Sequence, residues 1–112
     1  MQLWDTVSVL PDTYEGKSTV AAIRVDGNCV YVSNRGHDSI SVLEFSDGKL
    51  TLKNIISTYG NSPRDFIIFK DWLIVTNELS DDVAIISKQT GELVEKISVK
   101  SPLCVVLAEK YT

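Results

Sequence analysis

An internal repeat is the feature that most restricts the fold of this chain. Residues 20–54 align without a gap onto residues 63–97, at a separation of 43 positions. Apolar positions coincide along with polar ones, so each copy should form the same unit of structure. The identical pairs include Asn34 and Asn77, Asp38 and Asp81, Gly48 and Gly91, Leu50 and Leu93, and Lys53 and Lys96.

Each copy of the repeat contains four short runs that are rich in β-branched and aromatic residues. Hairpin-turn signals such as Asp26-Gly27-Asn28, Asp47-Gly48 and Thr90-Gly91 separate several of these runs. No apolar period of about 3.6 residues persists, so helices should be nearly absent. A repeat of about 40–45 residues with four strands has the size of one β-propeller blade. The predicted strands cover residues 19–25, 29–33, 39–45 and 50–57 in the first copy, and 64–69, 72–76, 82–87 and 93–99 in the second.

We therefore predict an all-β fold, a β-propeller fragment of two four-stranded antiparallel blades with a flanking strand at each end. Residues 1–16 would form the outer strand of a preceding blade and residues 101–112 the inner strand of a following one. Residues 17–60 and 61–100 would form the two blades. A closed propeller needs at least about four blades, so this would be a piece of a ring. Its open edges and blade faces should favour self-association.

Composition argues against two classes of partner. With 44% hydrophobic residues and a net charge of -4, the chain has no basic field to attract nucleic acid. No apolar run approaches the ~20 residues that span a bilayer, so we expect no membrane contact. The N-terminus lacks a basic leader, which favours the cytoplasm. Cys29 and Cys104 lie in apolar runs and are expected to be buried thiols, and a single histidine argues against a zinc site. We expect no metal and no other cofactor.

The connections between strands predict where a binding site would lie. In an up-and-down blade, the loop between the second and third strands shares one face with the loop that enters the first strand. Loops 35–39, 60–65, 78–82 and 100–103 should therefore converge near the mouth of the propeller channel. Charges that converge at a concave opening are typical of a binding site. The candidate residues are Arg35, His37, Arg64, Asp65 and Glu78.

The repeat separates structural candidates from functional ones. Arg35, His37 and Arg64 depart from it, which favours a task specific to one blade. The matching positions hold Glu78, Ser80 and Ala21. Because side chains alternate along a strand, only one of Arg64 and Asp65 should point into the channel. Repeated asparagine and aspartate residues have a structural interpretation, since both side chains stabilise turns. These residues are Asn34, Asn77, Asp38 and Asp81.

Four segments carry a resemblance to a known family. The runs YVSNRGHDSISVLEF, GNSPRDFIIF, LIVTNELSDDVAI and SPLCVVL resemble the C-terminal third of bacterial 6-phosphogluconolactonases of the seven-bladed propeller type. The resemblance covers almost the whole chain, although chains of that family are much longer. It implies hydrolysis of 6-phosphogluconolactone to 6-phosphogluconate in the pentose phosphate pathway, without a metal cofactor.

The resemblance also implies roles for the candidate residues. Arginine holds phosphate groups bidentately, so Arg35 and Arg64 could bind the phosphate or stabilise the oxyanion of ester hydrolysis. His37 is the candidate general base for a water nucleophile, because imidazole titrates near neutrality. In this interpretation His37 and Arg35 are catalytic, whereas Arg64, Asp65 and Glu78 bind the sugar-phosphate lactone. The chain has no Gly-x-Ser-x-Gly elbow, which argues against a serine acyl-enzyme. The alternative is a non-catalytic propeller piece that serves binding or assembly.

Overall fold

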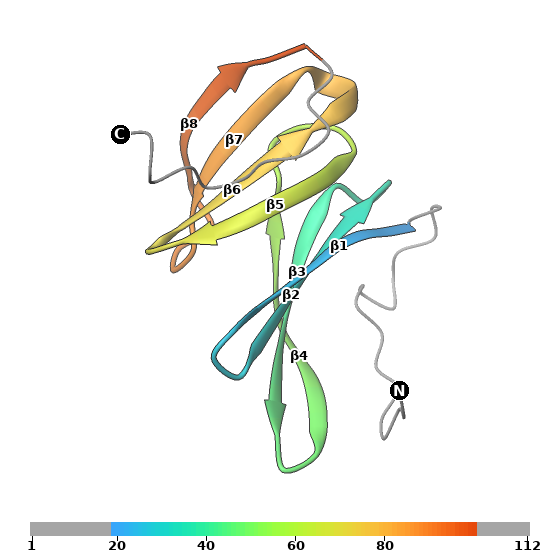
Figure 1. Ribbon diagram of the computed structural model, residues 1–112, viewed down its shortest axis with the longest axis vertical. Helices are drawn as coiled ribbons and strands as arrows, with labels where there is room; N and C mark the ends of the chain where they lie inside the picture. The colour runs from blue at the N-terminus through green and yellow to red at the C-terminus, as the bar shows by residue number, and fades with distance from the viewer. Residues whose placement is uncertain (1–18, 101–112) are drawn as a thin grey trace, which may run out of the picture.

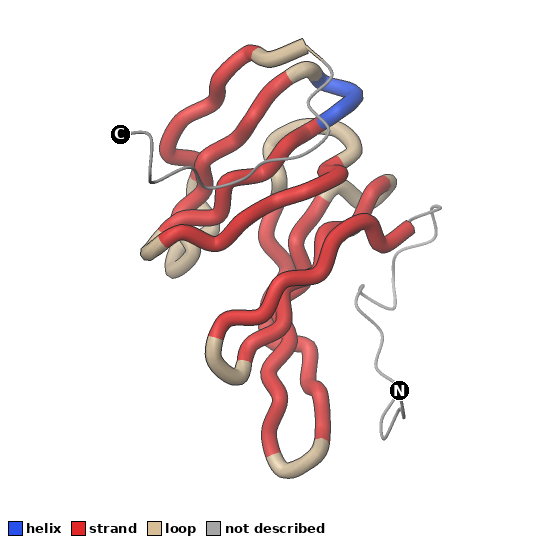
Figure 2. The backbone as a smooth tube through the Cα atoms, viewed as in Figure 1, coloured by secondary structure: helices blue, strands red, loops and turns tan. Residues whose placement is uncertain are grey.

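The computed structural model describes residues 19–100, which form two four-stranded antiparallel sheets (Figure 1). Figure 2 shows that the described part of the chain is almost entirely strands, turns and loops, with one short helical segment, the 3-10 turn η1 (Glu78–Ser80). The first sheet has the order β1-β2-β3-β4, with β1 (Thr19–Asp26), β2 (Cys29–Arg35), β3 (Ser39–Ser46) and β4 (Lys49–Ser57). The second has the order β5-β6-β7-β8, with β5 (Pro63–Phe69), β6 (Trp72–Asn77), β7 (Asp82–Ser87) and β8 (Leu93–Ser98).

The predicted all-β class with two four-stranded antiparallel sheets is confirmed. The flanking strands predicted for residues 1–16 and 101–112 lie outside the described residues. The corresponding domain boundaries therefore stay predictions.

The two sheets pack against each other through an apolar core. β5 lies against both β1 and β2, so the first strands of the two sheets are neighbours (Figure 1). Every second residue of a strand points to the same face, which explains why the apolar alternation in the sequence produces a continuous core. Burial of this surface contributes about 25 cal/mol per Å² of apolar area. The buried core residues are Ala22, Tyr31, Ile40 and Ile56 from the first sheet, and Phe66, Leu73, Val75, Ala84 and Ile86 from the second.

β5 carries a β-bulge at Arg64. Pro63 pairs with Asn77 and Asp65 pairs with Thr76, which makes Arg64 the extra residue on this strand. The Thr76 hydroxyl holds the bulge, because it accepts a hydrogen bond from Asp65 N at 3.1 Å and donates one to the Asp65 carbonyl at 3.1 Å. The bulge interrupts the regular alternation of side chains along β5.

β1 shows the same irregularity, between Val20 and Ile23. Here the Ser33 hydroxyl accepts a hydrogen bond from Ala22 N at 3.0 Å. Ser33 and Thr76 are 43 positions apart, as the repeat requires. The bulge therefore occurs in both copies of the repeat, whereas an arginine occupies it only in the second copy, as Arg64.

The gapless repeat fails in the last strand of each sheet. In the first sheet Leu43 pairs with Leu52, and in the second the equivalent Ile86 pairs with Leu93. The sequence alignment matches Leu93 with Leu50 instead, so β8 is displaced by two positions from the sequence match. Leu93 therefore takes the place in the second sheet that Leu52 takes in the first.

Candidate functional site

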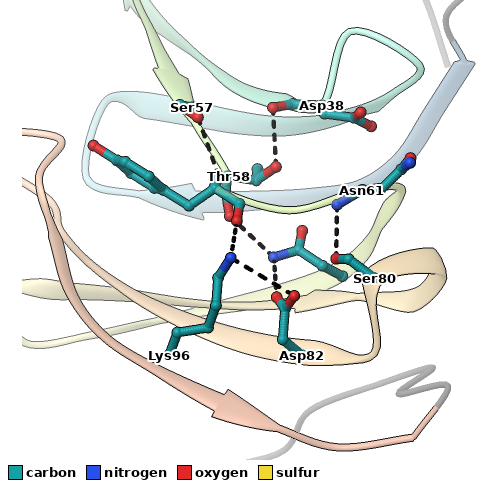
Figure 3. Close-up of polar contacts among 9 residues, drawn as sticks. Asp38, Ser57, Thr58, Asn61, Ser80, Asp82 and Lys96 are labelled. Carbon is teal, nitrogen blue, oxygen red and sulfur yellow. Dashed lines mark hydrogen bonds and ion pairs between the residues drawn. The ribbon is translucent and has the colours of Figure 1, made fainter.

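Three of the four predicted loops meet on one face: the β2–β3 loop, the segment at η1 and the connection between β4 and β5 (Figure 3). The fourth, at residues 100–103, lies almost wholly outside the described residues. Asp38 Oδ1 accepts a hydrogen bond from Ser62 N at 2.9 Å, and the Asp38 carbonyl accepts one from Thr58 Oγ1 at 2.9 Å. Glu78 N in η1 donates to the Ser62 carbonyl at 3.0 Å. Asp38 and the repeat-equivalent Asp81 both have left-handed backbone, with φ of 58° and 54°. The contacts of Asp38 support its structural interpretation, whereas for Asp81 the support is its left-handed backbone at the end of η1.

The two repeated asparagines are buried and hold the ends of the strands. Asn77 Nδ2 donates to the Thr58 carbonyl at 3.0 Å and to Asp82 Oδ1 at 2.8 Å. Because Thr58 follows β4, the first of these bonds ties the second sheet to the first. Asn34 Nδ2 donates to two serine hydroxyls of β3, at 3.1 and 2.8 Å. Figure 3 shows Asp82 and Thr58 together with Lys96, whose Nζ donates to the Tyr59 carbonyl.

A pocket of about 560 Å³ opens between the first strands of the two sheets. Every arginine of the chain lines it: Arg24 from β1, Arg35 from β2 and Arg64 from β5. None of the lysines within residues 19–100 does so. Guanidinium groups present paired donors that match phosphate and carboxylate oxygens. The remaining lining residues are Val20, Ala21, Ala22, Ile23 and Asp65.

Two ion pairs connect the pocket arginines to carboxylates. Arg24 Nη2 lies 2.6 Å from Asp65 Oδ1, and Arg64 Nη1 lies 3.6 Å from Glu78 Oε1. Glu78 reaches Arg64 from η1 and is not itself a lining residue. The lining side chains thus carry three positive formal charges and one negative. A concave site of this charge favours an anion.

Of the five predicted site residues, the structure brings Arg35, Arg64 and Asp65 into one pocket and places Glu78 against it. Both Arg64 and Asp65 line this pocket, and the expectation that only one of them faces the channel stays a prediction. The bulge at Arg64 accounts for the shared pocket, since an extra residue lets two successive side chains reach the same side.

The structure places His37 in the predicted β2–β3 loop, and its catalytic role stays a prediction. It is not among the described residues that line the pocket, and its Nδ1 lies 2.7 Å from Ser39 Oγ. Ser39 is buried, and its hydroxyl also accepts a hydrogen bond from Asn34. The structure therefore sets the imidazole within the polar network at the base of the β2–β3 loop.

Arg24 was not predicted, although it lines the pocket. Its equivalent in the second copy of the repeat is Ile67, so the criterion that singled out Arg35 and Arg64 applies to it as well. The prediction considered residues in loops and at strand entrances, whereas Arg24 lies near the middle of β1. Its contribution depends on the neighbouring sheet, which the sequence of β1 does not reveal.

Other kinds of site find no support within residues 19–100. This part of the chain holds no group of three or more His, Cys, Asp or Glu side chains that could bind a metal ion. None of its helical segments is long and apolar enough to cross a membrane. Cys29 is a free, half-buried thiol, and Cys104 lies outside the described residues.

The arrangement described so far is that of adjacent propeller blades with an arginine-lined pocket at their inner strands. A sequence model for the family "Lactonase, 7-bladed beta-propeller" matches residues 1–107. The chain belongs to this lactonase family.

Individual relatives agree with this assignment. The chain is 40% identical over 110 residues to the 6-phosphogluconolactonase of Bacillus subtilis (strain 168), covering 88% of this chain and 32% of that protein. It is 42% identical over 96 residues to an uncharacterized protein of Lactococcus lactis subsp. cremoris (strain MG1363), covering 79% and 28%. The chain thus spans about a third of the length of these relatives.

Solved structures show the same fold. A crystal structure of a protein from Lactobacillus plantarum superimposes with a TM-score of 0.75 at 34% identity, covering 88% of this chain and 32% of that chain. The periplasmic gluconolactonase PpgL of Pseudomonas aeruginosa gives a TM-score of 0.74 at 25% identity, covering 83% and 29%. Both alignments confirm that the two sheets correspond to part of a larger propeller.

Proposed function

We propose that this chain is part of a hydrolase that opens 6-phosphogluconolactone to 6-phosphogluconate, a step of the pentose phosphate pathway. The observation that carries the proposal is the gathering of Arg24, Arg35 and Arg64 around one pocket. The family and the Bacillus subtilis relative indicate lactone chemistry. The arginines add a reason for a phosphorylated lactone, because guanidinium forks bind phosphate groups bidentately.

The proposed reaction is attack of water on the lactone carbonyl. The tetrahedral intermediate carries an oxyanion, which Arg35 or Arg64 is suited to stabilise through charge-assisted hydrogen bonds. Collapse of the intermediate breaks the bond to the ring oxygen, which leaves as a hydroxyl group of the open acid. The geometry supports this role for Arg35 and Arg64, which line the pocket.

His37 remains the proposed general base, on the argument that imidazole accepts a proton near neutral pH. His37 follows Arg35, which lines the pocket, by two residues. Asp65 and Glu78, proposed as substrate-binding residues, would act mainly through the arginines that they contact.

The test is an assay of 6-phosphogluconolactone hydrolysis by the natural gene product that carries this sequence, corrected for spontaneous hydrolysis. Arg35→Ala should lower turnover at least about tenfold, because one contact to a developing oxyanion contributes a few kcal/mol. Lys53→Ala is a control, since Lys53 pairs with Glu44 away from the pocket. Absence of enzymatic hydrolysis would favour the non-catalytic alternative. We expect little activity from residues 1–112 alone, because they would supply only part of the channel wall.

A cytoplasmic location is proposed on the ground that the free thiol of Cys29 suits a reducing compartment.

We also propose that the isolated 112-residue chain self-associates through the outer face of the second sheet. Trp72 and Val94 are 40% and 56% exposed there and border an apolar hollow of about 340 Å³. The repeat matches Trp72 and Ile74 with Cys29 and Tyr31, which pack in or against the core that both sheets share. The exposed face thus uses positions that pack between blades, and a second copy would cover it. A monomer in sedimentation equilibrium at micromolar concentration would refute this, and Trp72→Lys should weaken the association.

A further inference from the structure

Arg24 is held more firmly than an exposed arginine on a strand usually is. Its Nη2 lies 2.6 Å from Asp65 Oδ1, and its Nη1 donates to the Ile23 carbonyl at 2.9 Å. Its guanidinium carbon lies 5.8 Å from the centroid of the Phe66 ring, and Phe66 is fully buried. An ion pair, a backbone acceptor and an aromatic face together determine the plane and direction of the guanidinium.

The partner of Arg24 is itself fixed. The Asp65 side chain is only 14% exposed, and the backbone of Asp65 is held on both sides by the Thr76 hydroxyl. Arg64 offers a contrast, because its side chain is 47% exposed and its nearest carboxylate oxygen, on Glu78, lies 3.6 Å away. Arg24 is therefore the pre-organised cation of the pocket and Arg64 the more adjustable one.

The contacts leave Arg24 able to bind a ligand. The two hydrogen bonds described above use two of the five N–H donors of a guanidinium. The side chain is 41% exposed and lines the pocket. With Asp65 counted, the lining residues have a net formal charge of two positive units, which matches a phosphate dianion.

The ion pair is specific to this junction between sheets. The repeat equivalents of Arg24 and Asp65 are Ile67 and Ala22, so neither partner is a general feature of the blade. A pair that merely fastened blades together would be expected to recur with the repeat. Neither partner is repeated within residues 19–100, and the pair lies at the arginine pocket, which favours a task in that pocket.

We propose that Arg24 determines selectivity for a substrate with a phosphate dianion, and that Asp65 is its positioning residue across the junction of the two sheets. This inference rests on the proposed function and assigns the phosphate-binding end of its pocket. The fixed guanidinium binds the phosphate group, which leaves Arg35 and Arg64 to face the lactone end of the same ligand.

The experiment measures binding of 6-phosphogluconate, gluconate and inorganic phosphate to the natural gene product by isothermal titration calorimetry. Arg24→Lys keeps the charge but loses the planar fork. It should weaken 6-phosphogluconate binding by about tenfold or more, the equivalent of one charge-assisted hydrogen bond, and leave gluconate binding unchanged.

Asp65→Asn gives the sharper result, because two explanations predict opposite signs. If the Asp65 carboxylate only sits near the pocket, it weakens anion binding through charge repulsion. Its removal would then make the pocket more positive and tighten anion binding. A carboxylate that positions Arg24 would strengthen binding, and its loss should reduce phosphate affinity. Asp26→Asn is the matched control, since it removes a carboxylate from the Lys88 ion pair, at 2.8 Å, away from the pocket.

Tighter phosphate binding by Asp65→Asn, or equal affinity of the original protein for 6-phosphogluconate and gluconate, would overturn the inference. Its failure is distinguishable from failure of the proposed function. Hydrolysis of phosphorylated and unphosphorylated lactones at equal rates, unaffected by Arg24→Lys, would leave the lactonase standing and remove the phosphate site. Selective binding of the phosphorylated ligand without hydrolysis would support the phosphate site and remove the lactonase proposal.

Discussion

The two repeated asparagines provide a matched pair for measuring how much the junction between the sheets contributes to stability. Asn77→Ala removes one hydrogen bond to the Thr58 carbonyl and one to the Asp82 carboxylate. Asn34→Ala removes two hydrogen bonds to serine hydroxyls within its own sheet. Both side chains are at most 1% exposed, so the lost volume and the loss of hydration are closely similar.

The expected magnitudes follow from the acceptors. A hydrogen bond between neutral groups contributes about 1 kcal/mol net, and one to a charged group about 1.5–3 kcal/mol. Asn34→Ala should therefore lower the free energy of unfolding by about 2 kcal/mol, and Asn77→Ala by about 2.5–4 kcal/mol. In both residues Oδ1 is buried without a hydrogen-bond partner within the described part of the chain, so its removal cancels in the comparison. After Asn77→Ala the buried Asp82 carboxylate keeps Lys96 at 3.8 Å.

The assay is urea unfolding followed by far-ultraviolet circular dichroism, with both variants compared at equal protein concentration. Similar slopes with urea would show that the variants unfold the same amount of surface. A cost of Asn77→Ala equal to or below that of Asn34→Ala would refute the reasoning. It would mean that the contact between sheets, and its charged acceptor, contribute no more than a bond within one sheet.

Two further predictions concern close packing and pH. A Cβ atom on Gly60 would clash with the Asn77 side chain, so Gly60→Ala should destabilise the fold by about 1–3 kcal/mol in the same assay. In Gly27→Ala the new Cβ meets no atom within 4 Å, so the only cost should be the strain of a side chain on left-handed backbone. Burial raises the pKa of Tyr31 above its ordinary 10.0, so the folded state keeps this proton to higher pH than the unfolded chain does. Stability should therefore be fully present below about pH 10 and fall above it, and Tyr31→Phe should reduce that fall; an unchanged alkaline slope would contradict the assignment.

The strands and tight turns were predictable because their causes are local. Alternating apolar residues and hairpin dipeptides act over a few positions, and the turn at Asp47 and Gly48 indeed has positive φ at both residues, 52° and 77°. The strand at residues 93–98 was predictable, but its register was not. Identical residues align Leu93 with Leu50, whereas the strand pairing gives Leu93 the place of Leu52, because register is specified by which face must be buried.

The repeat, the two four-stranded sheets and the candidacy of Arg35 and Arg64 follow from residue type and spacing along one strand or turn, so they could be predicted from the sequence. Three outcomes required the folded arrangement: a bulge brings Arg64 and Asp65 to the same pocket, Arg24 joins them, and His37 lies outside the lining. The physical reason is that these outcomes depend on contacts between sheets. Arg24 and Asp65 are 41 positions apart, and their 2.6 Å ion pair exists because β1 and β5 pack side by side.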